Sequence, residues 1–499
     1  MFPVIGNTQS LITYPEPVAN FEKKSDLYKV SVSRNGITKN SFVYVSQASV
    51  GAPKWEWQGQ EGKSFHFTTF SFSGKVTISV TKVNSNATAA TIRPYRVGLG
   101  TIATIKEASG SKVTFTLNRS RKVSVEFNDD PQNRQVLMIF ADTLEQASTI
   151  PVQTSANVYT PKPADSLIIP AGKNVVCFGP GVYNIKYFRV PATVKQIYIS
   201  GGAYLRGYIL ANRTGNSALK INGRGIISND QWAFHYPEVA DPRISLSGGW
   251  YKSVVINGGK GHVVEGIALI DGSAFNLVMA ADSSIVKNVK IHGFRYNNDG
   301  ITIAGKNDTI DDCFIRVGDD GIVANGSSNY KIENCIFWHL RGGSCIQLGW
   351  RPHNINGNNI IQNCDVVHAE WSAPQTQNSG FINYMGNIAG VAGYTIENFL
   401  VKDIYFDTEV FKVFDIRMNR GAVRTPLKIN NFVFKNIYAK IPAKLPGYAV
   451  YLNGYDADNR MSGIKFDHFY INGNLIHQNN YRQQGYFKVG DFVDSLVFN

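Results

Sequence analysis

The sequence predicts an all-β protein in which an N-terminal β-sandwich is followed by a right-handed parallel β-helix. Two observations carry this prediction. Short alternating segments fill roughly the first third of the 499 residues, and one hexad, aliphatic-x-Asn/Asp-x-x-aliphatic, recurs through the remainder. Long helical periods are absent from the sequence. We therefore expect a sandwich domain at 1–160 and a β-helix domain at 161–499.

The N-terminal part has the pattern of a sandwich because its apolar residues alternate over short runs bounded by turn residues. Arg34-Asn35-Gly36 and Ser109-Gly110-Ser111 are two such turns. The Pro-containing segment Thr160-Pro161-Lys162-Pro163 is a plausible linker. The strands that this pattern predicts lie at 27–32, 41–45, 64–72, 75–80, 112–117, 122–127 and 136–141.

The repeat that predicts the β-helix is most regular in eight hexads, which begin at Val264, Val286, Ile310, Ile332, Ile361, Ile396, Ile429 and Ile464. Short intervals between hexads leave only tight turns, whereas longer ones require a projecting loop. Asparagine in the third place tolerates left-handed backbone, and its amide can bond from coil to coil. Hairpins are the alternative reading, but they would not keep one hexad over eight rounds. We therefore expect an asparagine ladder at Asn288, Asn334, Asn363, Asn398 and Asn431.

The five cysteines are too few for a disulfide framework in a chain of this length. Three of them, Cys313, Cys335 and Cys364, occupy the fourth place of their hexads, which predicts an unbridged internal stack of small apolar side chains. No Cys or His pair has metal-ligand spacing, so we expect no metal and no cofactor. No run of eighteen apolar residues exists, so we expect no membrane span.

The formal charge of +13 leaves two readings open. It could indicate an acidic polymer as partner, but the basic residues are scattered, which favours a generally basic surface and no nucleic acid partner. The start, Met1-Phe2-Pro3-Val4, lacks a basic region and a long apolar segment. We expect a secreted or periplasmic protein whose signal peptide is missing from this sequence, with a cytoplasmic location left open.

The most informative stretch contains three carboxylates in two turns, Asn297-Asn298-Asp299-Gly300-Ile301 and Gly318-Asp319-Asp320-Gly321-Ile322. If one coil separates the turns, Asp299 lies about 4.8 Å from the Asp319–Asp320 pair, on a wall that we expect to face solvent. Like charges raise at least one pKa, so one acid stays protonated while another acts as base. Glycoside hydrolysis requires such a division. A single Asp-Gly would be read as a turn former; two at this interval indicate function.

These two turns resemble the active-site pattern of β-helical polysaccharide hydrolases, namely the family 28 polygalacturonases and the family 49 dextranases and isopullulanases. The sequence departs from family 28 in two places. Gly343 stands where that family has a histidine, and Asp415-Ile416-Arg417-Met418 keeps an arginine but loses a lysine. Both departures favour family 49, whose members also carry an N-terminal β-sandwich.

The resemblance implies roles for four residues. Asp319 would be the general acid, and Asp299 with Asp320 would hold the nucleophilic water. Asn297 would orient substrate or water. We further expect three aromatic platforms for sugar rings, Trp350, Trp371 and Tyr384, although each is also a common kind of core residue. Arg351 and Arg417 would contact hydroxyls or a carboxylate.

The expected function is inverting hydrolysis of a polysaccharide, foremost an α-glucan such as dextran or pullulan. A family 28-like hydrolase of pectin or of a sulfated galactan is one alternative, which the positive charge would favour. A non-catalytic carbohydrate-binding β-helix is the other. Lyase chemistry on this fold is disfavoured, because neither a carboxylate cage for Ca²⁺ nor a placed basic residue is evident.

Overall fold

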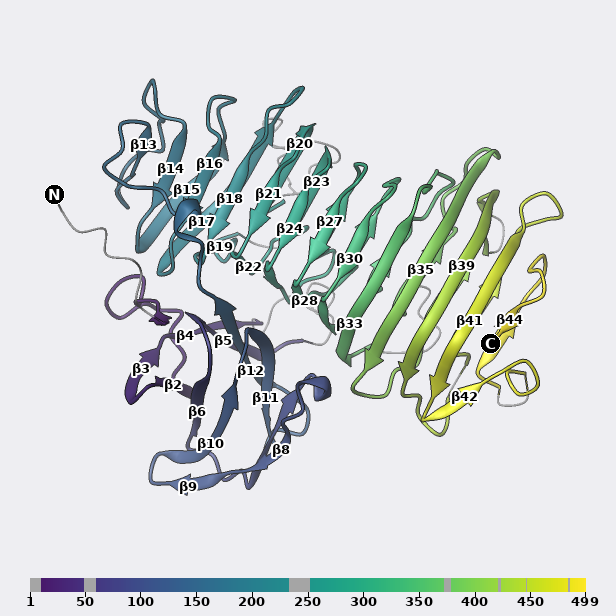
Figure 1. The fold of residues 1–499 in the computed structure, drawn as a ribbon, viewed down its shortest axis with the longest axis horizontal. Helices are drawn as coiled ribbons and strands as arrows, with labels where there is room; N and C mark the ends of the chain where they lie inside the picture. Colours follow the sequence, from purple (N-terminus) through teal and green to yellow (C-terminus); the bar gives the residue numbers. More distant parts are fainter. Residues whose placement is uncertain are drawn as a thin grey trace.

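The chain is built almost entirely of strands, as predicted. The computed structural model describes residues 10–48, 60–232, 252–371, 378–420, 423–445, 447–482 and 485–499. Within them the helices are two short 3-10 turns, η1 (Tyr95–Val97) and η2 (Ala147–Thr149), and no helix is long and apolar enough to cross a membrane. Figure 1 shows two parts, with the N-terminal sheets in purple and blue beside a long β-helix that runs from teal to yellow.

The N-terminal part is a sandwich of two sheets. One sheet has seven strands, and its strands are β1 (Leu11–Thr13), β4 (Val43–Gln47), β5 (Ser64–Phe72), β7 (Ala89–Arg93), β8 (Gly100–Ala103), β11 (Arg121–Phe127) and β12 (Gln135–Thr143). The other sheet has five, and its strands are β2 (Tyr28–Arg34), β3 (Ile37–Ser41), β6 (Val76–Val83), β9 (Ile105–Glu107) and β10 (Gly110–Leu117).

Strand β5 is buried on both faces, and this explains why its sequence carries more aromatics than a half-exposed strand needs. Phe70 and Phe72 pack into the core between the two sheets. Phe65 and Phe67 belong to a second cluster shared with the β-helix. Because successive side chains of a strand point to opposite faces, one strand joins the sandwich core to the helix.

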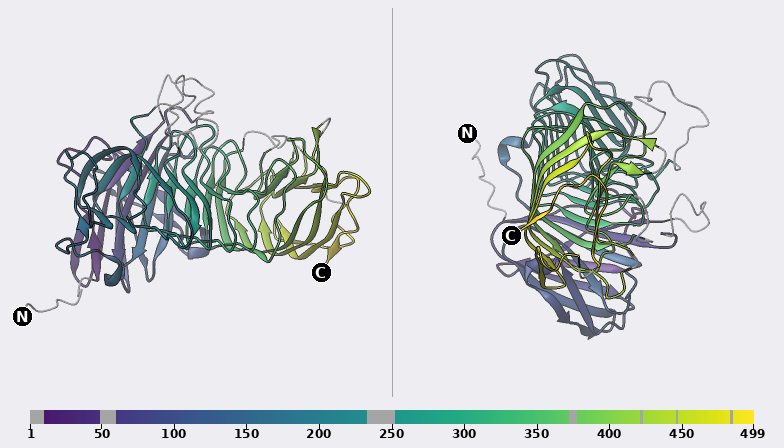
Figure 2. Two further views of the ribbon diagram at one scale, coloured as in Figure 1. Left: turned by 90° about the horizontal axis from the view of Figure 1, so that it is seen from above. Right: turned by 90° about the vertical axis from the view of Figure 1, so that its right-hand side faces the viewer.

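Thirty strands, from β13 to β44, form the β-helix, and its coils lie side by side along the long axis of the molecule (Figure 2). Parallel pairing between coils gives three sheets. The first contains β13 (Val158–Tyr159), β14 (Val175–Phe178), β16 (Gln196–Ile199), β18 (Lys220–Gly223), β21 (Val263–Glu265), β24 (Ile285–Lys287), β27 (Thr309–Asp311), β30 (Lys331–Glu333), β33 (Asn359–Ala369), β35 (Tyr394–Phe406), β39 (Leu427–Ala439), β41 (Met461–Ile471) and β44 (Val497–Phe498).

The second sheet faces the sandwich. It contains β15 (Gly181–Arg189), β17 (Ala203–Asn212), β19 (Ile226–Ser228), β22 (Ala268–Ile270), β25 (Lys290–His292), β28 (Phe314–Arg316) and β31 (Ile336–His339), and continues into β33.

The third sheet contains β20 (Val254–Lys260), β23 (Leu277–Asp282), β26 (Ile301–Ile303), β29 (Ile322–Ala324), β32 (Ile346–Gln347), β34 (Ile382–Met385), β36 (Phe414–Arg417), β40 (Val450–Asn453) and β43 (Phe487–Val489). Two antiparallel additions complete the set, the pair β37 (Asn419–Arg420) with β38 (Val423–Arg424), and β42 (Asn474–Ile476) beside β41.

The predicted cysteine stack is confirmed. Cys313, Cys335 and Cys364 are fully buried and unbridged, and they occupy equivalent places in consecutive coils, since Phe314 pairs with Ile336 and Ile336 with Asp365. Thiol contacts run along this column between successive coils. The column is part of one apolar interior that extends through the β-helix.

The asparagine ladder exists, but as two ladders and not one. All five predicted asparagines have left-handed backbone, with φ between 52° and 60°. Asn363 donates to Asn334 in one column, and Asn431 donates to Asn398 over 2.8 Å in another. The hexad at Ile396 is therefore out of register with the hexad at Ile361, whose partner in the next coil is Val401. The prediction of a single column was wrong because two corners of the coil use the same residue at the same kind of bend.

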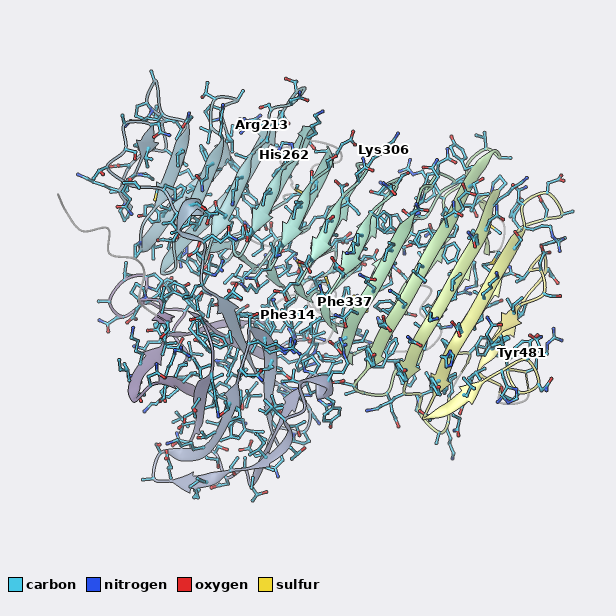
Figure 3. All side chains as sticks on the ribbon, viewed as in Figure 1. Arg213, His262, Lys306, Phe314, Phe337 and Tyr481 are labelled. Carbon is cyan, nitrogen blue, oxygen red and sulfur yellow. The ribbon has the colours of Figure 1, made fainter. Side chains whose placement is uncertain are left out.

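An apolar and charged interface fixes the sandwich against the second sheet of the helix. Phe65 stacks on His292 with ring centroids 3.9 Å apart, and Phe314 lies at the boundary between the two parts (Figure 3). Buried Lys290 donates to Asp142 over 2.5 Å. Strands β25 and β28, which lead into the two aspartate turns, are thus held from outside by the sandwich.

Candidate active site

The two aspartate turns join the second sheet to the third, one coil apart. The first runs from β25 to β26 and the second from β28 to β29. Ile301 pairs with Ile322, and the Gly300 N–H donates to the Asp320 carbonyl over 2.9 Å. Asp299 therefore stands beside Asp320 on neighbouring rungs, as the spacing of the turns predicts.

The glycine after each carboxylate is required by close packing. A Cβ at Gly300 would lie 2.3 Å from the Gly321 carbonyl oxygen, and one at Gly321 would lie 2.7 Å from that of Cys345. Neither position is among the glycines with positive φ. These glycines let three consecutive coils approach each other, and so bring Asp299 and Asp320 together.

Exposure differs among the three acids. Asp299 and Asp320 are 5 % and 1 % exposed, whereas Asp319 is half-buried. The expectation that all three carboxylates face solvent was wrong for Asp299 and Asp320. Asp319 and Asp320 lie in the bend between β28 and β29, and the difference in exposure shows that they meet different surroundings.

Among the three acids, Asp320 accepts the most hydrogen bonds from protein side chains and backbone. Its Oδ1 accepts hydrogen bonds from the Ser344 N–H at 2.8 Å and the Ser344 hydroxyl at 2.9 Å. Its Oδ2 accepts from the Asn378 amide at 3.2 Å. Burial raises the pKa of Asp320, and these three donors oppose the rise, so that the pKa is about 6.

The other two carboxyls are driven toward their neutral form. Burial, followed by the charge of Asp320, raises the pKa of Asp319 well above its usual value. Burial, followed by the charges of Asp319 and Asp320, does the same for Asp299, with Lys252 opposing. Because the three groups titrate together, the cluster at neutral pH holds fewer than three negative charges. Such a cluster contains both a proton donor and a carboxylate base.

Asn297, the predicted orienting residue, does reach the site. Its Nδ2 lies 3.5 Å from Oδ2 of Asp319, and its backbone is left-handed, with φ of 49°. Asparagine is one of the few residues that adopts this conformation readily. The side chain is thereby aimed at the more exposed carboxyl.

Gly343 explains why this chain has no histidine in the corresponding turn. Its φ is +74°, and a Cβ there would lie 2.3 Å from the Asp319 carbonyl carbon and 2.4 Å from the Asp320 nitrogen. Both atoms belong to the backbone that carries the two acids. Any side chain at this position would displace Asp319 and Asp320, so the loss of the histidine is built into the geometry of the turn.

Two of the predicted sugar platforms are corrected by the structure. Tyr384 is fully buried in the interior of the β-helix. Trp371 is 3 % exposed, and its indole N–H donates to the Gly343 carbonyl over 2.9 Å. Neither ring presents a face to a ligand. Trp371 instead supports the Gly343 turn from behind, which sequence spacing alone could not distinguish from exposure.

Three further predicted contacts remain at the surface of the third sheet or of its loops. Trp350 is half-buried and Arg351 is exposed, in the loop after β32. Arg417 forms a two-pronged contact with Asp415, at 2.5 and 2.6 Å, and lies 4.5 Å from the ring centre of Tyr451. Its Nε and Nη2 are therefore already engaged by a carboxylate.

Sequence reasoning missed the groups that hold Asp320. Asn378 Oδ1 accepts a hydrogen bond from Gln347 Nε2 over 2.9 Å, and Gln347 Nε2 also donates to Asn383 Oδ1 over 3.2 Å. Ser344 lies inside a turn that the sequence did single out, and its place one coil after Asp320 is the clue that could have revealed it. Asn378 is 58 residues from Asp320, and no local pattern links them.

In the described part of the chain, no group of three or more His, Cys, Asp or Glu side chains is placed to hold a metal ion. The two aspartate turns present a proton-holding acid beside a buried carboxylate, at one corner of a parallel β-helix. A proton donor beside a proton acceptor is what the acid–base chemistry of the glycoside hydrolase class requires.

Comparison with known proteins agrees with this class. No family model matches the chain. Isopullulanase from Aspergillus niger is 25 % identical over 429 residues, which cover 77 % of this chain and 74 % of that protein. A dextranase from Arthrobacter globiformis is 23 % identical over 411 residues, covering 69 % of this chain and 63 % of that enzyme.

The fold extends the similarity to nearly the whole molecule. Dex49A from Penicillium minioluteum superposes with a TM-score of 0.78 at 19 % identity, covering 98 % of this chain and 96 % of that one. The predicted resemblance to the dextranases and isopullulanases of family 49 is thus confirmed. The chain is a β-helical glycoside hydrolase.

Proposed function

We propose that this protein hydrolyses an α-glucan, such as dextran or pullulan, with inversion of the anomeric configuration. The observation that carries the proposal is the unequal environment of three carboxyls at one corner. Asp320 accepts three hydrogen bonds that favour its ionised form, while Asp319 is more exposed and has a raised pKa. One group can donate a proton when the other accepts one.

In the proposed reaction, protonated Asp319 gives its proton to the glycosidic oxygen as the bond from that oxygen to the anomeric carbon breaks. A water held by Asp299 and Asp320 attacks the anomeric carbon from the opposite side, and the Asp320 carboxylate takes the water's proton. The Asp320 charge also keeps Asp319 protonated beforehand, because it raises the pKa of Asp319. Both carboxyls return to their starting states by proton exchange with solvent.

A neutral substrate is supported by two features of the site. Arg417 is engaged by Asp415 and so is poorly placed to receive a uronic acid carboxylate. The backbone at Gly343 leaves no room for the histidine found in the family 28 pattern. The relatives named isopullulanase and dextranase point the same way.

The test is reducing-sugar release from dextran, pullulan, polygalacturonate and carrageenan, followed by NMR of the first product formed. We expect release from an α-glucan, with the new reducing end first appearing in the β configuration. Release from polygalacturonate or carrageenan alone would replace the substrate proposal. An α product that appears first would replace the inverting mechanism, because retention requires a covalent intermediate.

A further inference from the structure

A second polar hollow lies on the sandwich, away from the catalytic corner. Its volume is about 500 Å³, and none of the described residues that line it is acidic. The basic side chains around it come from three turns. Its lining residues are Lys75, Arg96, Val97, Leu99, Thr116, Leu117, Asn118, Arg119 and Arg121.

Strand pairing brings these basic residues together. Leu117 pairs with Val76, which places the β10–β11 turn, with Arg119, beside Lys75. Arg121 opens β11, and Arg96 lies in the 3-10 turn η1. The grouping of like charges is therefore a fixed property of the sandwich and not of flexible side chains meeting by chance.

Two of these cations form no ion pair within the residues that the structure describes. Arg96 is paired with Asp365 through two contacts of 2.7 Å. The guanidinium groups of Arg119 and Arg121, by contrast, have no hydrogen-bond or ion-pair partner among the residues that the structure describes. Arg121 is half-buried, and burial followed by the charges of Arg119 and Arg96 lowers its pKa, against the weaker opposing charges of Asp312 and Asp365. Unbalanced positive charge in a partly desolvated hollow favours an anion.

The hollow continues toward the β-helix. A neighbouring cavity of about 530 Å³ shares Arg96, Val97, Arg119 and Arg121 with it and reaches the asparagine ladder. The charges deeper in this cavity are balanced, for example Lys122 by Asp312 at 2.6 Å. The two unbalanced arginines thus lie where the two cavities meet. Around them, neutral polar side chains suited to sugar hydroxyl groups are supplied by Thr116, Asn118 and Ser120.

We propose that Arg119 and Arg121, with Lys75, form a binding site for the acidic groups of an anionic polysaccharide. The arginine fork suits carboxylate and sulfate oxygens, and the neutral hydroxyls and amides suit the sugar hydroxyls between them. The site is distinct from the hydrolytic corner. Asp312 borders the neighbouring cavity before β28 begins, whereas Asp319 follows the end of β28. A chain held here leaves the catalytic turn accessible.

The experiment measures binding of the full-length protein to polygalacturonate, for carboxylates, and to carrageenan, for sulfates, with uncharged dextran as reference. The variants are Arg119→Gln/Arg121→Gln and the charge-preserving Arg119→Lys/Arg121→Lys. We expect the glutamine pair to raise the Kd for at least one acidic polymer tenfold or more, because two charge-assisted contacts are lost. The lysine pair should retain part of the affinity, and binding should weaken with salt.

The matched control is Lys428→Gln/Lys465→Gln, which removes the same charge from exposed positions on β39 and β41. An equal loss in this control would show that only net charge matters and would overturn the site. An unchanged Kd in the arginine variant would do the same, and tighter binding to duplex DNA than to both glycans would overturn the assigned ligand. Hydrolysis of α-glucan is a separate measurement, so failure of the proposed reaction and failure of this site are distinguishable.

Discussion

Two groups of buried acids in this molecule behave in opposite ways. At the interface between sandwich and helix, burial would raise the pKa of Asp142, but Lys290 and Arg224 outweigh it and hold the pKa below its usual value. Glu370 is similar: Arg316 and Lys63 overcome burial and lower its pKa to about 2. At the corner that holds Asp299, Asp319 and Asp320, burial raises the pKa of Asp299, and the charges of the other two carboxyls raise it further.

The comparison shows that burial alone does not mark a functional acid. What differs is the sign of the neighbouring charge. A buried carboxylate beside a lysine stays ionised and joins two parts of the protein, whereas one beside a second carboxylate retains a proton. Asp142 pairs with Lys290 of β25, and Asp299 lies in the turn that follows β25. The two opposite effects on the pKa therefore occur close together, and the neighbouring charge decides which one results.

The largest expected effect is at the proposed catalytic carboxyls. Asp319→Asn should lower kcat by about 10³-fold or more, because a positioned acid contributes roughly 10²–10⁴ and its loss disturbs the neighbouring pair. Asp299→Asn and Asp320→Asn should be similarly impaired. Turnover on the true substrate measures this, with circular dichroism as the check on folding. Near-normal turnover in any of the three variants would remove that residue from the mechanism.

Replacing Asp142, the acid at the interface between sandwich and helix, should lower stability and leave turnover unchanged. Asp142→Asn leaves Lys290 buried without its partner, and breaking a buried pair in this way costs about 3–5 kcal/mol. We expect a lower urea midpoint and an unchanged kcat per folded molecule. A variant that loses turnover without losing stability would show that the two acid groups are functionally coupled.

The same substitution at Asp299 sharpens this contrast. The folded pKa of Asp299 is raised, so the stability it contributes is present below the unfolded pKa and is lost as pH rises through the folded value. Asparagine stays neutral and avoids that loss. At pH 7, Asp299→Asn should therefore unfold at a higher temperature than the wild type, whereas Asp142→Asn should unfold at a lower one.

A smaller effect should follow from Ser344→Ala, which removes one of the three donors to Asp320. Losing that hydrogen bond raises the pKa of Asp320 above its value of about 6. The base must be ionised, so activity falls as pH drops through this pKa, and the acid limb of kcat/KM should move upward by about one pH unit. An unmoved limb would mean that another group sets it.

Much of this architecture could be predicted from local pattern. The hexads predicted the coil, and the fourth-place cysteines predicted an interior column. The interval between the two Asp-Gly turns predicted that Asp299 lies beside Asp320. Each of these depends on residues within one or two coils. Periodicity is informative there because every coil repeats the same burial pattern.

Other features depend on long-range packing that periodicity does not encode. Ile361 pairs with Val401 and not with Ile396, so the two hexads are out of register. The sequence does not reveal this, because two different bends of the coil accept the same left-handed asparagine. The support of Asp320 by Asn378 comes from a distant coil. Trp371 and Tyr384 lie near the site in sequence, but whether a ring points inward or outward depends on its place within the coil.

The smallest expected effects concern these aromatic residues. Trp350→Ala should raise KM several-fold, because Trp350 is half-buried and an aromatic contact contributes about 0.5–1.5 kcal/mol. Tyr384→Phe should leave both KM and kcat unchanged. Its ring is buried, and its hydroxyl has no hydrogen-bond partner in the described part of the chain, so phenylalanine removes only an unsatisfied polar atom. Steady-state kinetics on an α-glucan compares the two variants directly. A raised KM for Tyr384→Phe, with Trp350→Ala unaffected, would contradict both assignments and restore Tyr384 as a residue that affects substrate binding.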